Sequence, residues 1–96
     1  MVYAEFTREP DFGALVELLQ IHFDQVSYGR QGDDWIWVEE DDCKVEIDTF
    51  WSMQLQIKTA SADCTLIKRV LDLIETKFPV QRFSEPSLEP HEDPNE

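Results

Sequence analysis

An unbroken alternation of side-chain character over residues 45–58, which read VEIDTFWSMQLQIK, is the strongest structural signal in the chain. The odd positions carry apolar residues or Thr, and the even positions are charged or polar apart from Phe50. A period of two indicates a β-strand with one buried face. Because neither Gly nor Pro interrupts the run, we favour one long strand that bends or bulges near Thr49–Ser52. A three-residue loop over 50–52 also keeps the parity, so two strands are the alternative.

The same stretch selects its pairing with the residues that precede it. The sequence WIWVE at 35–39 is typical of a strand, and the Asp-rich sequence EDDC at 40–43 is typical of a turn. One register places apolar residues opposite one another, pairing Val38 with Val45 and Ile36 with Ile47. A slip of one residue would set this apolar series against charged residues, so the hydrophobic pattern favours this register.

This register places large aromatic residues on the face that does not hold the apolar series. Trp37 lies opposite Glu46, Trp35 lies opposite Asp48, and Phe50 has the same parity. Aromatic residues beside polar groups are typical of a surface that binds a protein partner or a second copy of the chain. We therefore expect these five residues to form a partner-binding surface. The alternative is that a helix, the first strand or the tail covers this face.

Two segments have apolar residues at the three- and four-residue spacing of an amphipathic helix. The first runs from Phe12 to Val26, with Leu18 and Ile21 widening its apolar stripe. Gly29 follows it and suits the left-handed position that ends many helices. The second runs from Leu66 to Phe78 and ends before a proline. Both stripes predict packing against one face of a sheet.

The two ends of the chain differ in composition. Residues 1–6 read MVYAEF and alternate, which predicts a short edge strand, and residues 80–83 favour a last short strand. Residues 84–96 hold three prolines and five acidic residues without Lys or Arg, which is typical of a disordered acidic, Pro-rich tail. We therefore predict one α+β domain at 1–83. It is expected to be a two-layer sandwich, with two helices on one face of an antiparallel sheet of three or four strands.

Acidic residues dominate the charge of the chain, since 21 Asp and Glu against 8 Lys and Arg give a formal net charge of −13. This balance argues against direct binding to nucleic acid or to membranes, and it permits a basic partner. No apolar run approaches the ~18 residues of a membrane span, and the start of the chain lacks the pattern of a signal peptide. Cys43 and Cys64 form no Cys-x-x-Cys motif, so we expect two reduced thiols and a cytoplasmic protein.

Candidate catalytic and metal-binding residues are sparse. The acidic run at 39–42 lacks the spaced oxygen ligands, turn glycine and distal glutamate of a calcium loop, and it is typical of a solvated hairpin tip. His22 and either Cys43 or Cys64 would be a catalytic pair only if the fold brought them together. We expect His22 to be a half-buried structural residue and both thiols to be packing residues. No metal ion or cofactor is expected.

Three functions fit these features. The first is a small protein-interaction or regulatory module that uses the aromatic face to bind a protein partner or to form a homodimer. The second is an acidic decoy that imitates a phosphate backbone. The paired acids at 33–34 and 41–42 favour this function. The third is a small enzyme of unknown reaction, which only scattered polar residues support. Salt separates the first two, because decoy binding should weaken steeply with salt and aromatic docking should not.

Overall fold

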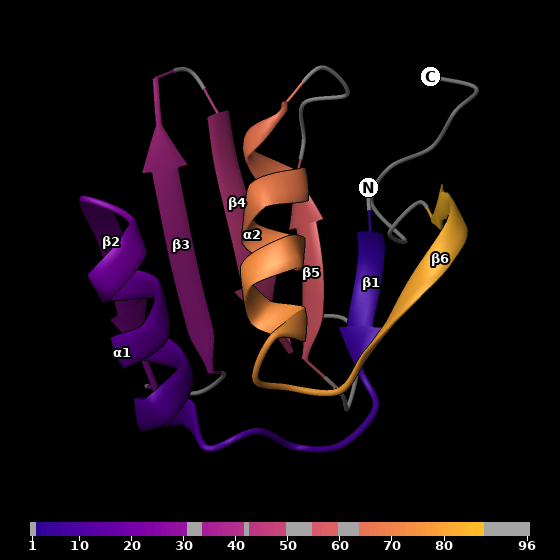
Figure 1. The fold of residues 1–96 in the computed structure, drawn as a ribbon, viewed down its shortest axis with the longest axis horizontal. Helices are drawn as coiled ribbons and strands as arrows, with labels where there is room; N and C mark the ends of the chain where they lie inside the picture. Colours follow the sequence, from indigo (N-terminus) through magenta and orange to yellow (C-terminus); the bar gives the residue numbers. More distant parts are fainter. Residues whose placement is uncertain (1, 31–33, 42, 50–54, 60–63, 88–96) are drawn as a thin grey trace.

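The computed structural model describes residues 2–30, 34–41, 43–49, 55–59 and 64–87, and these form one sheet with two helices (Figure 1). In chain order the elements are β1 (Val2–Phe6), α1 (Phe12–His22), β2 (Gln25–Gly29), β3 (Trp35–Glu40), β4 (Cys43–Asp48), β5 (Gln56–Thr59), α2 (Leu66–Glu75) and β6 (Val80–Ser87). The strand order is β2-β3-β4-β5-β1-β6, and every neighbouring pair is antiparallel. The predicted α+β class with an antiparallel sheet is therefore confirmed, but the sheet has six strands where three or four were expected.

The alternating stretch 45–58 contains two strands rather than one. β4 and β5 pair with each other, with Ile47 opposite Ile57, so the chain reverses between them. The prediction of one long strand was wrong. Odd-numbered residues of β4 pair with odd-numbered residues of β5, so the apolar side chains stay at odd positions on both sides of the chain reversal. The alternative of two strands is confirmed, although the connection is longer than the three residues considered. Residues 50–54 of this connection lie outside the described residues.

The hairpin of β3 and β4 has the predicted register. Its pairs are Ile36 with Ile47, Val38 with Val45, Trp35 with Asp48, Trp37 with Glu46 and Glu39 with Lys44. Asp41 occupies the turn with a φ of 54°, a left-handed conformation that Asp tolerates better than most residues. The apolar pairs lie in the core beneath the helices, as the hydrophobic pattern required.

The first helix is shorter than predicted. Asp11 caps its start, where Oδ1 accepts a hydrogen bond from the Ala14 backbone N–H at 3.1 Å. Phe23 already has extended backbone, and the following residues form β2, which places Val26 opposite Val38 of β3. The helix was extended too far because Phe23 and Val26 fit the spacing of a helix and that of a strand equally well.

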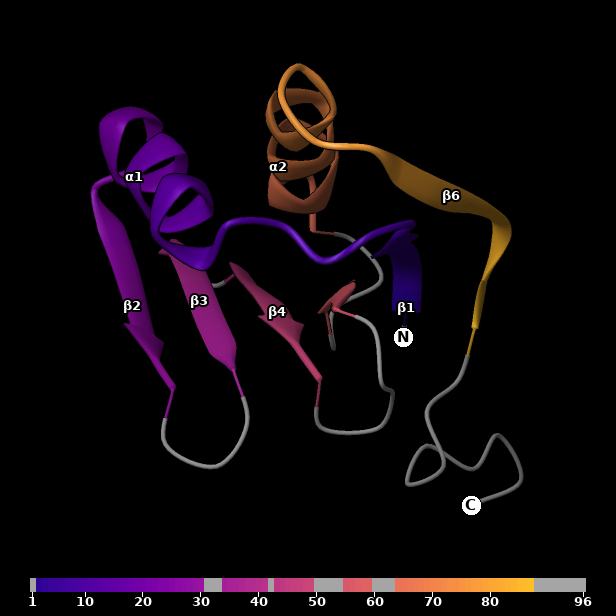
Figure 2. The ribbon, with the colours of Figure 1, turned by 90° about the horizontal axis from the view of Figure 1, so that it is seen from below.

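The core lies between one face of the sheet and the helices, and Figure 2 shows α1 and α2 on the same side of the strands. The residues that the helices bury there are Phe12, Leu15, Val16 and Leu19 of α1 and Leu66, Ile67, Val70, Leu71 and Ile74 of α2. The buried stripe of α1 is narrower than predicted, because Leu18 is half-buried and Ile21 is 70% exposed. The helix therefore keeps an apolar strip on its outer surface.

The sheet also extends further at its C-terminal end than predicted. β6 pairs with the outer side of β1, so β1 is an interior strand and not the expected edge strand. β6 also runs past the 80–83 segment that the sequence favoured, and the predicted start of the tail at Ser84 falls within it. Residues 88–96 of that predicted tail lie outside the described residues.

Candidate functional site

Trp35 and Trp37 are in close ring contact on the sheet face that points away from the helices. Ile36 and Val38 are fully buried in the core, and the alternation along β3 sends the two indoles to the opposite side. The ring centroids are 4.7 Å apart, and the ring planes are inclined by 41°. Both residues are half-buried, so part of each side chain is accessible. The register thus places the pair on the face that the sequence indicated.

Lys44 of β4 packs against this pair. Its Nζ lies 4.4 Å from the centroid of the Trp37 ring, which is a cation–π contact, and 3.6 Å from Oε1 of Glu46. The Nε1–H of Trp37 is buried and has no hydrogen-bond acceptor among the described residues. An unsatisfied buried donor costs free energy until an acceptor reaches it. The surface therefore combines aromatic area, an ammonium group and a carboxylate, and the unsatisfied donor lies beneath it.

Gly29 of β2 provides the space for the Trp35 ring. The two residues are directly opposite each other in the β2–β3 pairing, and a Cβ at position 29 would lie 2.7 Å from Nε1 of Trp35. The sequence suggested that Gly29 ends a helix, whereas it lies in a strand and permits a close approach of the indole. A glycine facing a large ring across a strand pair is the signal that would have identified this role.

Replacing Gly29 with alanine is expected to displace the Trp35 ring, because the added methyl group would overlap it. Overpacking of this kind costs about 1–3 kcal/mol of stability, and it should change the near-UV circular dichroism of the tryptophans. Gln25→Ala, on the same face of β2 but opposite Glu39, is the matched control and should leave the spectrum unchanged. A wild-type spectrum for Gly29→Ala would mean that the ring does not rest on this glycine in solution.

Asp48, which was expected at the accessible margin of the surface, is fully buried. Its Oδ1 lies 2.6 Å from Nζ of Lys58 on the neighbouring strand β5, and the Lys58 side chain is also enclosed. Glu46 is half-buried and remains beside the tryptophans, whereas Phe50 lies outside the described residues. The structure thus brings the two tryptophans and Glu46 together, adds Lys44 and Gly29, and uses Asp48 in a buried ion pair.

A polar cavity of about 160 Å³ lies at the ends of several strands, and its lining residues are Phe6, Arg8, Glu9, Pro10, Asp34, Thr49 and Leu55. Beside it, Nε of Arg30 donates to Oδ1 of Asp34 at 3.0 Å, and this hydrogen bond raises the pKa of Arg30. The described residues of the lining include neither histidine nor cysteine. Sequence reasoning missed this cavity because its walls come from four separate segments.

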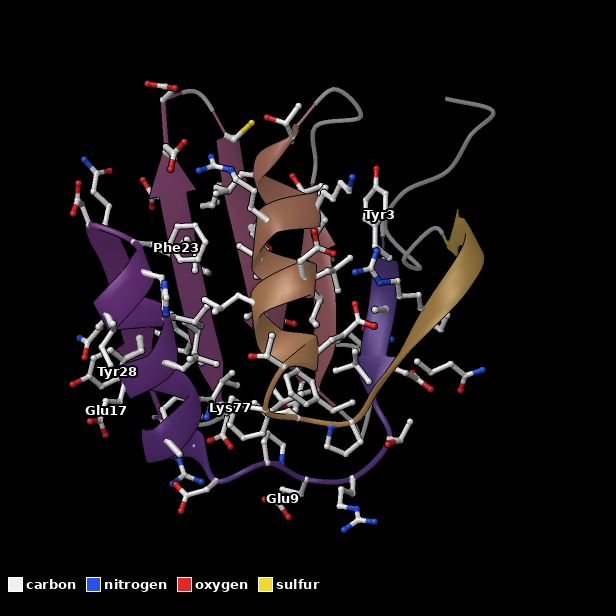
Figure 3. All side chains as sticks on the ribbon, viewed as in Figure 1. Tyr3, Glu9, Glu17, Phe23, Tyr28 and Lys77 are labelled. Carbon is white, nitrogen blue, oxygen red and sulfur yellow. The ribbon has the colours of Figure 1, made fainter. Side chains whose placement is uncertain are left out.

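A groove of about 250 Å³ follows the outer side of α1, lined by Ala14, Glu17, Leu18, Ile21, Lys77 and Phe78. Figure 3 shows Lys77 at the lower ends of the two helices, where α2 leads towards β6. The sequence missed this groove because Leu18 and Ile21 were assigned to the core. Its lining is mainly apolar and favours no particular class of ligand.

The two cysteines lie together, which their spacing in the sequence did not indicate. The Cys43 thiol, at the start of β4, lies near the Cys64 thiol, and the interaction with that thiol together with burial raises the pKa of Cys43. A raised pKa lowers the thiolate fraction and thus disfavours nucleophilic catalysis. His22 is exposed at the end of α1, and not half-buried as predicted.

Within the described ranges, no group of three or more His, Cys, Asp or Glu side chains is arranged to hold a metal ion. None of the helices in the same ranges is long and apolar enough to cross a membrane. No family model, curated protein or solved structure matches the chain. The function is therefore argued from the residues and the geometry of the site.

Proposed function

We propose that this protein is a small protein-interaction module that binds a partner protein through Trp35, Trp37, Lys44 and Glu46, here named the tryptophan face. In this proposal the domain has two layers, with the helices on one face of the sheet and the partner on the other. The observation that carries it is a pair of indoles in close, tilted contact on a face that no described helix or strand covers.

The composition of the tryptophan face suits binding to a protein. Burying apolar surface is favourable by about 25 cal/mol per Å², and tryptophan is enriched among the residues that dominate binding free energies. Lys44 and Glu46 would form a polar rim that orients the partner.

The charge of the chain favours a basic partner. The formal net charge is −13. Among the described residues, five basic side chains pair with acids, namely Arg30, Lys44, Lys58, Arg69 and Arg82. The excess of acidic groups would steer a cationic protein towards the molecule. The contact of Lys44 with Trp37 is a precedent for a partner's Lys or Arg stacking on the exposed part of Trp35.

We expect Trp37→Ala to weaken binding to a basic partner by about 30-fold or more, since a dominant interface tryptophan contributes about 2 kcal/mol or more. The loss in free energy of unfolding should be smaller than the loss in binding, because the ring is only half-buried. Fluorescence anisotropy with a panel of labelled Lys- and Arg-rich peptides measures binding, and a urea melt measures stability.

The matched control for this test is Gln81→Ala, an exposed polar position on the other edge strand, which should leave binding and stability unchanged. If Trp37→Ala unfolds the protein while the folded fraction still binds normally, the indole is a core residue. That result, or the failure of the wild-type protein to bind any basic peptide, would contradict the proposal.

An acidic decoy is the second candidate, and the net charge of −13 favours it. A decoy would bind a nucleic-acid-binding protein through many charge pairs, so its affinity would fall by orders of magnitude between about 50 and 200 mM salt. Binding of a basic partner through the tryptophan face would also weaken, but the contribution from burying the indoles would persist over that range. Trp37→Ala would also leave decoy binding intact. The third candidate, a small enzyme, has no arrangement of described side chains in its favour.

A further inference from the structure

The two edges of the sheet differ in how they are protected from further pairing. β6 contains Pro86, which has no N–H to donate, and its pairing with β1 shifts register between Val2 and Ala4. Arg82 also ties β6 to α2 through Asp72 at 2.7 Å. The opposite edge strand, β2, has neither Pro nor Lys and pairs with β3 in an unbroken register. No described strand covers its outer side.

The outer edge of β2 also exposes aromatic surface. Tyr28 is 51% exposed and lies at the outer margin of the sheet, where Figure 3 labels it. Its ring contacts Phe12 of α1 edge to face, with centroids 6.2 Å apart, so it is held in place on the helix side. A strand with free backbone groups and an exposed aromatic side chain is a ready template for another strand.

β2 is complementary to its own sequence in the antiparallel direction. If two copies pair about Ser27, Asp24 of each copy faces Arg30 of the other, and Val26 of each faces Tyr28 of the other. Asp24 is exposed, and the Arg30 side chain is 60% exposed although it pairs with Asp34 in the monomer, so Arg30 can contact Asp24 of the other copy in addition to Asp34. Opposite charges on facing positions stabilise a strand pair, and the symmetry produces this charge pair twice.

We propose that a second copy of the chain docks on β2, edge to edge and antiparallel about Ser27, so that the two sheets become continuous. The two-fold axis would run perpendicular to the sheet and leave both tryptophan faces free for a partner protein. A purely basic strand would be attracted by Asp24 but repelled by Arg30. A second copy instead places an opposite charge beside each of these two residues. This inference goes beyond the proposed function and does not depend on it.

Charge repulsion between the copies determines the conditions under which the dimer should be sought. Each copy carries a formal charge of −13, which opposes association at low ionic strength. At about 0.15 M salt the screening length is about 8 Å, so distant charges interact weakly while the facing pairs of β2 still attract. Dimerisation should therefore be measured at this salt concentration or above.

Cross-linking tests the register directly in the full chain. Two copies of Ser27→Cys would face each other with Cα atoms roughly 4.5–5.5 Å apart, within the range of a disulfide. Gln25→Cys, on the same face of β2, is the matched control, because its two copies would be separated by roughly 14 Å. We expect a mild oxidant to give a covalent dimer for Ser27→Cys only, with the wild type as background for Cys43 and Cys64. Equal cross-linking of both variants, or none for Ser27→Cys, overturns the proposal.

Sedimentation over a concentration series provides the second measurement. Ser27→Lys places two ammonium groups opposite each other at the axis and should weaken dimerisation at least tenfold. Gln81→Lys makes the same change in charge on β6 and should leave dimerisation unchanged. A wild type that stays monomeric at every concentration overturns the inference. A dimer that Trp37→Ala abolishes and Ser27→Lys preserves also overturns it, because self-association would then belong to the tryptophan face.

Discussion

Replacing Lys58 with methionine is expected to lower the free energy of unfolding by about 3–5 kcal/mol, because the buried carboxylate of Asp48 would lose its ammonium partner. The two groups are 2.6 Å apart on neighbouring strands, and both side chains are enclosed. Methionine has a similar length and volume, so the measured loss would report the removed charge rather than a cavity. Urea unfolding followed by far-UV circular dichroism gives the difference in free energy.

Two further variants establish that the effect comes from the buried pair. Lys68→Met removes an exposed ammonium group from α2 and should change stability by less than about 1 kcal/mol. The double variant Asp48→Leu with Lys58→Met should recover much of the loss, because an apolar pair of similar volume replaces a broken ion pair. If Lys58→Met alone is as stable as the Lys68→Met control, the Asp48–Lys58 pair is exposed to water in solution. That result would contradict the buried ion pair.

The buried pair also limits the extent of the candidate binding surface. Asp48 follows Glu46 on the same face of β4, yet Glu46 is half-buried while Asp48 is enclosed. The accessible part of this face therefore lies towards the β3–β4 turn, around Trp37 and Lys44. Variants on β5 should then act on folding, whereas variants around Trp37 should act on binding, which separates the two roles experimentally.

The register of the β3–β4 hairpin could be predicted from the sequence because only one alignment places apolar residues opposite apolar residues. Val38 faces Val45 and Ile36 faces Ile47, and any slip by one residue would bury charges. The same pairing predicts that the two tryptophans lie on the opposite face of the hairpin. Short-range pairing with a strong hydrophobic pattern is the part of this fold that the sequence specifies most directly.

Other parts of the fold could not be predicted because two structures satisfy the same local pattern. Phe23 and Val26 fit a longer α1 and also fit a turn into β2, and only pairing with β3 decides between them. The chain reversal between β4 and β5 cannot be seen in the sequence pattern either, since the residue pairs of these two strands preserve the alternation of apolar and polar residues. These choices depend on contacts with distant segments, which periodicity does not report.

The candidate site was predictable where it depends on one hairpin and unpredictable where other strands contribute. Lys44 could have been placed beside Trp37, since it precedes Glu46 by two residues on the same strand face. Gly29 and Lys58 come from strands whose pairing was not predicted, so the space for Trp35 and the burial of Asp48 both remained hidden. The adjacent thiols of the two cysteines were missed for the same reason.

We expect Leu19→Ala to lower the free energy of unfolding by about 2–5 kcal/mol, because it removes a fully buried side chain from beneath α1. Ile21→Ala, two residues further along the same helix, should change stability by less than about 0.5 kcal/mol. Its side chain is 70% exposed, and alanine is the better helix former at an exposed position. Urea melts of the two variants beside the wild type measure both effects.

The comparison of Leu19 with Ile21 tests the orientation of α1 and, through it, the existence of β2. A helix that continued to Val26 could rotate to bury Ile21 as well as Leu19, and the two alanine variants would then lose similar amounts of stability. In the structure α1 ends before Phe23, and the turn into β2 holds the helix with Leu19 inward and Ile21 outward. A large loss for Ile21→Ala would therefore contradict the short helix and the edge strand that follows it, and with them the surface on which a second copy is proposed to dock.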